Sequence, residues 1–497
     1  MGFDISFTGA GRGRTAVAKW PVALLAGVLT GLVGCGTADN KSHLSKISAP
    51  PSYSVSTSSN ASSVEGWLAD FNSPQLNGLI AEAQEQNLDL QISAARLMAA
   101  FGAAKIGRAV QLPTLSSDFG AARNKRTSSS GFRLTSPKTD QFDIGLDFAW
   151  ELDLWGRLAH RSRAAYADLE AAKSDLLGAR FSLAANTAKS WFRLIEADLQ
   201  LRLAESSHES FKTNLTVLEE RFKRGVGKAL DVRLTRANVA SAESIRKARR
   251  RERDESARAL EVLLGRYPAD KIVAASALPI IEREVPAGLP SELLARRPDL
   301  VAAERRLASA DERFKDVKKN LLPNISLTTS AGYSSSALEE LLEPQQNVWR
   351  LAANLVQPIF RGGQLKGARM RAEAVLVEQI ATYSQAVLGA CQEVENALGS
   401  EIYLREQEAA LKVAATESIA AEELAWDQYT RGLVDIVTVL ESQRRSVSAR
   451  GSLLLISRNR LQNRIDLYLA LGGEFFIKPP FNLSTVPPVN DASETRP

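Results

Sequence analysis

Residues 141–150 read Gln-Phe-Asp-Ile-Gly-Leu-Asp-Phe-Ala-Trp, and every second side chain in this stretch is large and apolar. The apolar set is Phe142, Ile144, Leu146, Phe148 and Trp150. A period of two predicts a β-strand with one apolar and one polar face. The length fits the 9–11 residues of a tilted strand that crosses a bilayer. Asp143 and Asp147 fall on the polar face, where we expect them to line a lumen rather than to act as an acid/base pair.

Three further stretches alternate in the same way, so the sequence predicts four strands. They cover about 113–123, 140–150, 323–333 and 347–357. A four-stranded sheet packed on helices is one interpretation. A membrane sheet is the other, and four strands cannot close a barrel because single-chain barrels start at eight. Open strand edges in lipid would leave backbone groups unpaired, at several kcal/mol each. Membrane strands therefore predict that several protomers share one barrel.

Two long segments contain no proline and predict very long helices. They lie between Pro137 and Pro268 and between Pro358 and Pro479, and a glycine turn divides each. The turns are Arg224-Gly225-Val226-Gly227 and Arg431-Gly432-Leu433. A helix from about Ala159 to Arg224 would be roughly 100 Å long at 1.5 Å per residue. Such a helix needs partner helices along its length, which predicts coiled-coil hairpins.

The two halves of the chain repeat each other. At a spacing of 207 residues, Arg224-Gly225 matches Arg431-Gly432 and Leu264-Gly265 matches Leu471-Gly472. At a spacing of 210 residues, Leu112-Pro113 matches Leu322-Pro323. Matches in the same order indicate a tandem duplication. We expect one repeat over 67–265 and a second over 284–472, with a linking equatorial segment over 266–283 and a tail over 473–497.

The N-terminus has the pattern of a lipoprotein signal. Basic residues precede an apolar stretch over 22–33, and Gly34 and Cys35 follow it. This order predicts a secretory signal peptide over 1–34. The ending Leu32-Val33-Gly34-Cys35 resembles a lipobox, with cleavage between Gly34 and Cys35 and lipid on Cys35. The alternative is an unlipidated signal. Residues 35–66 would then be the lipidated N-terminus and a polar tether.

Composition excludes several classes of function. Lys and Arg outnumber Asp and Glu by 62 to 57, a net charge of +5 that does not indicate nucleic-acid binding. With three histidines and two cysteines, the sequence offers no metal-ligand cluster, and no nucleophile is spaced with a base. We therefore expect no enzyme activity, catalytic residue, metal or cofactor. Cys391 lies on an apolar helical stripe and is predicted to be a small core residue.

Several motifs resemble the TolC-like outer-membrane factors, and among these the NodT/OprM-type lipoproteins. The motifs are residues 67–71 with Ser73-Pro74, the run Trp150-Glu-Leu-Asp-Leu-Trp-Gly-Arg157, Gln357-Pro-Ile-Phe360 with Gly362-Gly363, Val285-Pro-Ala-Gly-Leu-Pro-Ser291, and Arg297-Pro298-Asp299-Leu300. The resemblance implies an α+β membrane protein. Each protomer would give four transmembrane strands to a trimeric 12-stranded barrel above long periplasmic helical hairpins.

The resemblance also assigns roles to the two turns. The turns would be periplasmic tips that contact an adaptor and close the tunnel. The residues concerned are Arg224, Gly225 and Val226 in one repeat and Arg431, Gly432 and Leu433 in the other. Asp435 and Glu441, just past the second tip, are candidate acids of a gate.

The function that this resemblance implies is an outer-membrane channel of a tripartite efflux system. It would export small molecules as a homotrimer, together with a periplasmic adaptor and an inner-membrane pump of the RND class. Two alternatives remain at this point: the outer-membrane component of type I protein secretion, and a non-channel periplasmic coiled-coil lipoprotein. Only the channels would need the four membrane strands.

Overall fold

A computed structural model describes residues 67–125, 128–130, 133–135, 138–281 and 296–472. Cys35, the signal peptide, the tether, the motif at 285–291 and the tail from 473 lie outside the described residues. All described residues belong to one compact unit that covers 49–497. Among the described helices, none has a stretch apolar and long enough to cross a membrane.

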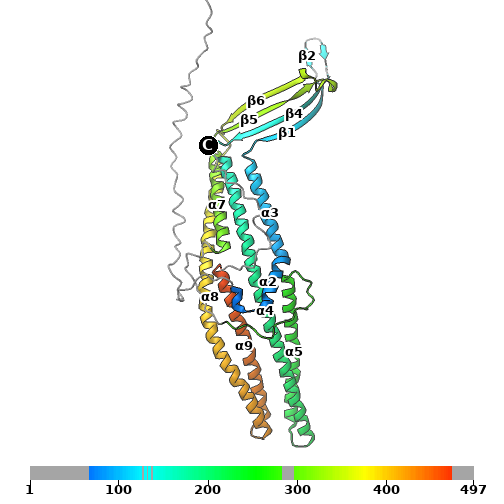
Figure 1. Cartoon of the computed structure of the whole chain (residues 1–497), viewed down its shortest axis with the longest axis vertical. Helices are drawn as coiled ribbons and strands as arrows, with labels where there is room; N and C mark the ends of the chain where they lie inside the picture. The colour runs from blue at the N-terminus through cyan, green and yellow to red at the C-terminus, as the bar shows by residue number, and fades with distance from the viewer. Residues whose placement is uncertain (1–66, 126–127, 131–132, 136–137, 282–295, 473–497) are drawn as a thin grey trace, which may run out of the picture. The chain divides into compact units, whose positions relative to one another are not determined.

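The first half of the described chain runs from short helices through a strand pair into a long helical hairpin (Figure 1). Its main elements are η2 (Trp67–Phe71), α2 (Pro74–Gln86), α3 (Leu88–Ala109), β1 (Thr114–Lys125), β4 (Lys138–Leu152), α4 (Arg157–Lys223) and α5 (Ala229–Leu263). The second half has the same order. Its main elements are α7 (Pro298–Lys319), β5 (Asn324–Ser335), β6 (Asn347–Val356), α8 (Gln364–Thr430) and α9 (Ile436–Ala470).

The bounds of the elements show the duplication directly. Adding 210 to the bounds of α3 and β1 gives those of α7 and β5. Adding 207 to the bounds of α4 and α5 gives those of α8 and α9. The spacing falls by three because the connection between the strands is shorter in the second half. Each residue of these paired elements therefore has a defined counterpart in the other repeat.

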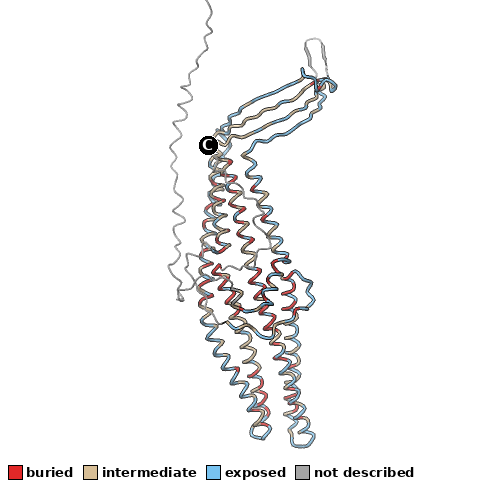
Figure 2. Tube along the Cα trace, viewed as in Figure 1, coloured by how far each residue is buried: buried red, intermediate tan, exposed pale blue. Residues whose placement is uncertain are grey.

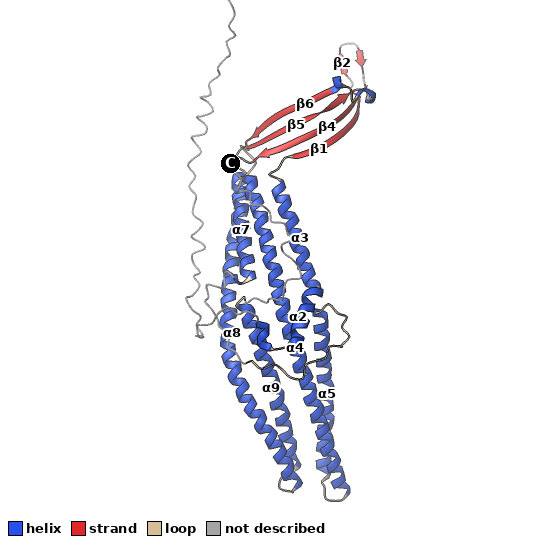
Figure 3. Cartoon of the chain, viewed as in Figure 1, coloured by secondary structure: helices blue, strands red, loops and turns tan. Residues whose placement is uncertain are grey.

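The four predicted strands form one antiparallel sheet in the order β1-β4-β5-β6 (Figure 3). The sequence predicts a polar loop between the first two strands. In the structure that loop contains a small hairpin of β2 (Ser128–Ser130) and β3 (Arg133–Thr135). The corresponding connection in the second half holds two single-turn 3-10 helices, η3 (Leu338–Glu340) and η4 (Pro344–Gln346).

The helices pack mainly on α4. This helix contacts α3, α5, α7 and α9, whereas α8 packs against α7 and α9. Buried residues are concentrated in the helical part, and the sheet is largely exposed or half-buried (Figure 2). The main core surrounds Trp191 and Phe192 of α4 and joins α2, α5, α8 and α9. Residues 266–281 have no helix or strand, but Ile272 is buried in the same core.

Long helices form because their apolar stripes are covered along their length. The predicted stripe of α8 is buried at Leu376, Ile380, Val387, Val394 and Leu398. Cys391 on this stripe is half-buried, with a free thiol. A second core, near the far ends of the hairpins, joins Leu218 and Val232 of one hairpin to Tyr429 and Val439 of the other.

Candidate functional site

The sheet has two chemically different faces, and strand register determines them. Residues paired across an antiparallel ladder lie on the same face. Asp147 pairs with Ser116 and Ser330, and Ser330 pairs with Arg350. This row is polar across all four strands. Gly145 and Gly332, which pair with each other, also lie on this face.

The polar face gathers carboxylates from two strands. Asp143 pairs with Gly120 and Ser334, and the Ser334 hydroxyl donates to Asp143 Oδ1 at 2.6 Å. Asp118 and Asp147 line the same shallow hollow, and Arg350 borders it. The sheet thus places both Asp143 and Asp147 on its polar face. A sheet closed with this face inward would have a water-filled lumen.

The opposite face is largely apolar, although Ser117, Thr329 and Asn347 also lie on it. Its central row pairs Phe119 with Ile144 and Ile144 with Tyr333. Leu115, Phe119, Leu146, Trp349, Leu351 and Leu355 are all more than half exposed on this face. Lipid is the environment that suits such a face, because apolar side chains facing outward make the band of a membrane barrel.

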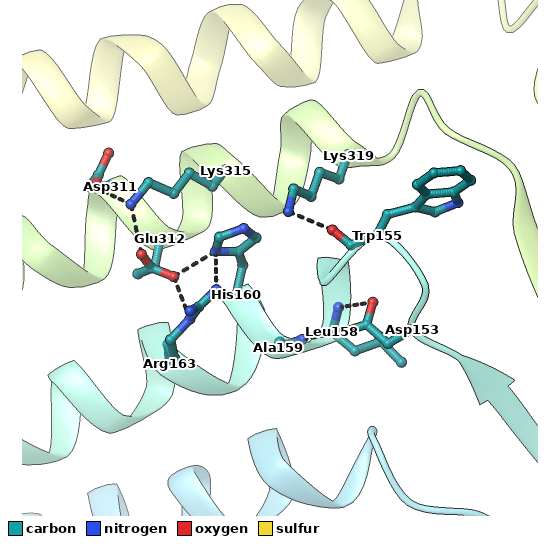
Figure 4. A network of polar contacts seen from close by, with 10 residues as sticks. All are labelled: Asp153, Trp155, Leu158, Ala159, His160, Arg163, Asp311, Glu312, Lys315 and Lys319. Carbon is teal, nitrogen blue, oxygen red and sulfur yellow. Dashed lines mark hydrogen bonds and ion pairs between the residues drawn. The ribbon is translucent and has the colours of Figure 1, made fainter. Parts of the chain in front are cut away.

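A polar network fixes the sheet to the helices at the start of α4 (Figure 4). Asp153 accepts hydrogen bonds from the backbone N–H groups of Leu158 and Ala159, at 3.0 and 2.7 Å. Lys319 Nζ donates to the carbonyl of Trp155 at 2.5 Å, and thus joins α7 to the same turn. The motif over 150–157 therefore sets the angle between strand and helix.

Next to this turn, α4 and α7 are joined by charged side chains that are mostly half-buried (Figure 4). His160 Nδ1 lies 2.7 Å from Glu312 Oε2, and Arg163 Nε lies 3.0 Å from the same oxygen. Burial alone would raise the pKa of Glu312, but hydrogen bonds from Lys315 and His160 hold that pKa below its usual value. Burial raises the pKa of Asp316 although Arg157 lies 3.8 Å away.

Each of the two hairpin turns has a glycine in the left-handed backbone conformation, which this kind of turn requires. Gly225 has φ +79° and Gly432 has φ +77°. In each turn the glycine N–H and the next N–H bond back to the helix, as in Val226 to Arg221 and Leu433 to Gln428. This pattern is the Schellman motif. Val226 and Leu433 are about 70% exposed, so each turn presents one apolar side chain to solvent.

The two candidate gate acids have partners within the chain. Asp435 is the N-cap of α9, and Oδ1 accepts from Thr438 N at 2.9 Å. That backbone hydrogen bond lowers the pKa of Asp435. Glu441 accepts from Arg445 Nε at 2.8 Å and also bonds Arg444, and the Arg445 hydrogen bond lowers its pKa. Both acids border one groove between α8 and α9. Within the described ranges, no His, Cys, Asp and Glu side chains cluster as a metal site would need.

Comparison with known proteins agrees with this arrangement. The sequence matches the family described as outer membrane efflux protein over residues 79–266 and 289–473, one match for each repeat. The chain belongs to the outer membrane efflux protein family.

Similar members of the outer membrane efflux protein family come from several bacteria. The pyoverdine export outer membrane protein OpmQ of Pseudomonas aeruginosa is 31% identical over 440 residues, which are 85% of this chain and 90% of OpmQ. The toluene efflux pump outer membrane protein TtgI of Pseudomonas putida is 31% identical over 408 residues, 81% of this chain and 86% of TtgI.

Solved structures of outer-membrane channels have the same fold. OprN superimposes with a TM-score of 0.80 at 27% identity, over 86% of this chain and 97% of OprN. The open state of MtrE from Neisseria gonorrhoeae superimposes with a TM-score of 0.75 at 27% identity, over 86% of this chain and 96% of MtrE. The predicted family, the outer-membrane location and the role as an efflux channel rather than an enzyme are confirmed by these relatives.

Sequence reasoning did not single out every residue of the outer membrane efflux protein's polar face. Asp118 falls on the polar positions of the predicted strand over 113–123, whereas Arg350 is not predicted as a polar-face residue. Which acids share a row could not be read from the sequence, because it depends on strand register. The charged contacts between α4 and α7 were also missed, since they join residues more than 130 positions apart.

Proposed function

We propose that three copies of this chain close a 12-stranded barrel, through which small molecules leave the periplasm. The observation that carries the proposal is the two-faced sheet with two open edges. Within the described sheet, β1 and β6 each pair on one side only. Their antiparallel order lets β6 of one copy pair with β1 of the next. Closure would remove every open edge from lipid, where unpaired backbone groups cost several kcal/mol each.

The repeat supplies the register of the missing strand pair. Between the repeats, β4 pairs with β5, and Gly145 lies opposite Gly332. The counterpart of Gly145 is Ala352 on β6, and the counterpart of Gly332 is Ala122 on β1. By this rule, Ala352 lies opposite Ala122 of the next copy, with both side chains on the polar face. Among the pairs generated in this way, Arg350 lies opposite Asn124 on the polar face and Leu355 lies opposite Phe119 on the apolar face. Mixed pairs also occur, with Val356 opposite Asp118 and Leu351 opposite Arg123.

Disulfide crosslinking tests the barrel. Ala352→Cys with Ala122→Cys, in a Cys391→Ala background, should form dimers and trimers on oxidation, because directly opposed Cα atoms of antiparallel strands lie about 4.5–5.5 Å apart, within the range of a disulfide. Ala352→Cys with Ala121→Cys is the matched control, since Ala121 lies on the other face. No crosslinking of the first pair, or equal crosslinking of both, would contradict the proposal.

The helical hairpins would continue the conduit into the periplasm and meet its partners there. The relatives OpmQ and TtgI are named for export or for an efflux pump. We therefore propose a periplasmic adaptor and an inner-membrane pump, usually of the RND class, as partners. The tips would contact the adaptor through Arg224, Gly225, Val226, Arg431, Gly432 and Leu433, and Asp435 and Glu441 would border the gate. Lipid on Cys35, after cleavage at Gly34, would add an anchor.

The relatives export chemically different compounds, to judge from pyoverdine and toluene in their names. A conduit that serves different cargo does not need a selective pocket, and we propose that the pump selects the cargo. Type I protein secretion is not supported by the names of these relatives. A non-channel coiled-coil lipoprotein does not agree with the family assignment.

A further inference from the structure

Four charged side chains lie at the end of the sheet that is farthest from the helices, where β1 ends and β4 begins (Figure 1). They form two pairs across the ladder, with Arg123 opposite Asp140 and Lys125 opposite Lys138. Counting by twos along β1 from Phe119 places Arg123 and Lys125 on the apolar face, and their ladder partners share that face. The face that we propose to meet lipid therefore ends in three cations and one carboxylate.

The charges begin where the apolar band is long enough to cross a bilayer. On β4 the apolar set runs from Phe142 to Leu152, which is about 34 Å along the strand at 3.4 Å per residue. At the usual strand tilt this length gives roughly 25 Å of height, as in the lipid-facing band of membrane barrels. Asp140 and Lys138 are the next two residues on the same face. They therefore fall at the level of the lipid headgroups.

The pair of lysines is the observation that points to a ligand. Lys125 and Lys138 are directly opposite each other, and both side chains are exposed. Like charges that are directly opposite destabilise an antiparallel pair. Among the described residues, neither lysine forms an ion pair, because Arg123 takes up the carboxylate of Asp140 with two hydrogen bonds, that from Nη2 at 2.6 Å. An anion between the two lysines would replace this repulsion by attraction.

The second repeat forms the same strands without the cations. The counterparts of the four charged residues are all uncharged, and they are Tyr333, Ser335, Gln345 and Asn347. The connection between β5 and β6 instead carries three exposed acids, which are Glu339, Glu340 and Glu343. Since β5 and β6 pair without a cationic cluster, folding of the strand pair does not require one. The cluster of the first repeat therefore calls for a role in binding.

We infer that Arg123, Lys125 and Lys138 bind the phosphate groups of the glycolipid of the outer leaflet, lipopolysaccharide. The inference rests on the proposed function, because it takes the apolar face to meet lipid and the helices to lie in the periplasm. Phosphate fits the cluster, since it accepts several charge-assisted hydrogen bonds from Lys and Arg at once. The ligand is a lipid because the cluster continues the apolar band: acyl chains cover the band while the phosphates neutralise the cations beyond it.

Lipid binding to the purified trimer tests the inference. With diphosphoryl lipid A as the probe, native mass spectrometry in detergent should show up to three lipids on the wild-type trimer. Lys125→Gln with Lys138→Gln should weaken binding by about thirtyfold, because two cations near an anionic lipid surface are lost. The matched control is Arg350→Gln with Lys412→Gln, which removes two exposed cations from the polar face and from α8. This control should bind lipid A as the wild type does.

Three further probes identify the part of the lipid that is bound. Monophosphoryl lipid A should bind more weakly than diphosphoryl lipid A, because it carries less negative charge. Inorganic phosphate at the same concentration should not displace the lipid, since it has no acyl chains to cover the apolar band. Displacement by inorganic phosphate would show an anion site without a lipid. Phosphatidylglycerol that binds as tightly as lipid A would show that the cluster does not select the glycolipid. Either result would overturn the assignment.

Hydrogen exchange at the ends of β1 and β4 gives a readout that changes sign. Without lipid, Lys125→Gln with Lys138→Gln should exchange more slowly than the wild type over residues 122–125 and 138–141, because the like-charge pair is gone. With lipid A, the wild type should gain protection there and the variant should not. A cluster with a structural role alone would leave the variant less protected in both conditions.

The outcomes separate this inference from the proposed function. A wild-type protein that is not a trimer, or in which the cysteines at positions 352 and 122 do not crosslink, would overturn the proposed function itself. A crosslinked trimer that binds no lipid A, or binds it equally with and without the two lysines, would overturn the lipid site and leave the barrel standing.

Discussion

The indole of Trp150 and the side-chain amide of Gln357 make the same hydrogen bond in the two halves of the chain. Trp150 Nε1 donates to the carbonyl of Gln111 at 3.0 Å, and Gln357 Nε2 donates to the carbonyl of Leu321 at 2.7 Å. The two donors are counterparts at a spacing of 207, and the two carbonyls at a spacing of 210. Each bond holds the turn between a helix (α3 or α7) and the strand that follows it.

This relationship predicts that the hydrogen-bond donor of Trp150 matters more for the turn after α3 than its aromatic ring does. Trp150→Gln should keep the turn after α3 intact, because Gln performs the same task at position 357. Trp150→Phe keeps an aromatic ring but leaves the Gln111 carbonyl unpaired, which should cost about 1 kcal/mol. Amide hydrogen exchange over residues 109–115 is the measurement. Faster exchange in Trp150→Gln than in Trp150→Phe would contradict this role.

The two faces of the sheet should tolerate charge differently. Leu146→Arg puts a cation on the apolar face, at about 2–4 kcal/mol per site near the middle of the bilayer, and three copies would multiply this cost. We expect strong depletion of Leu146→Arg from the outer membrane. Gly145→Arg, one residue away on the polar face, should insert normally, because a Cβ there meets no atom closer than 3.4 Å. Asp147→Asn should also insert. Equal amounts of all three in membrane fractions would show that the apolar face does not meet lipid.

The second tip should be needed for export but not for folding. A Cβ on Gly432 would meet no atom within 4 Å, so Gly432→Val introduces only the strain of the left-handed turn, about 1 kcal/mol. We expect a normally inserted trimer that no longer exports and no longer crosslinks to the adaptor. Gly362→Val is the matched control, since Gly362 is also left-handed with open space around it but lies between β6 and α8. Full export by Gly432→Val would leave the tip glycine with a structural role alone.

The start of α9 should be stable over the neutral and mildly acidic range. The pKa of Asp435 is lowered by the hydrogen bond from Thr438 N, so the folded state favours the carboxylate. That contribution is complete above the unfolded-state pKa of about 3.9 and is lost as pH falls through the lower folded value. The relative protection of amides 436–440 against hydrogen exchange should therefore stay constant from pH 7 to 5. It should change only below about pH 4.

Two substitutions separate the cap from the charge. Asp435→Asn retains an N-cap acceptor and should remove the acid sensitivity with little loss at neutral pH. Asp435→Ala removes the acceptor and should weaken protection at every pH. If Asp435→Asn behaves like Asp435→Ala at pH 7, the carboxylate does more than cap the helix.

The N-terminal cysteine should carry lipid. Palmitate should label the wild-type protein and not Cys35→Ala, because only a cysteine at the cleavage position can be acylated. We expect the four strands to insert without the lipid, so that the Cys35→Ala protein should still reach the outer membrane in reduced amount. Equal label in both proteins would contradict lipidation at Cys35.

The sequence alone determined the main features that depend on neighbouring residues or on repetition. Alternation over 141–150 identified a two-faced strand because side chains of an extended chain point to opposite sides in turn. Proline-free segments with one glycine turn each identified the hairpins, and Gly225 and Gly432 adopt the left-handed conformation that a helix end favours. The spacings of 207 and 210 identified the duplication that the bounds of the elements reproduce.

Only the tertiary structure decided which residues meet across the repeats. The row that joins Asp147 to Ser330 depends on register, which a shift of one residue would reverse. The same holds for His160 and Glu312, whose 2.7 Å contact closes a loop of 152 residues. Contacts of this kind arise from packing, because no local pattern in either segment specifies its distant partner.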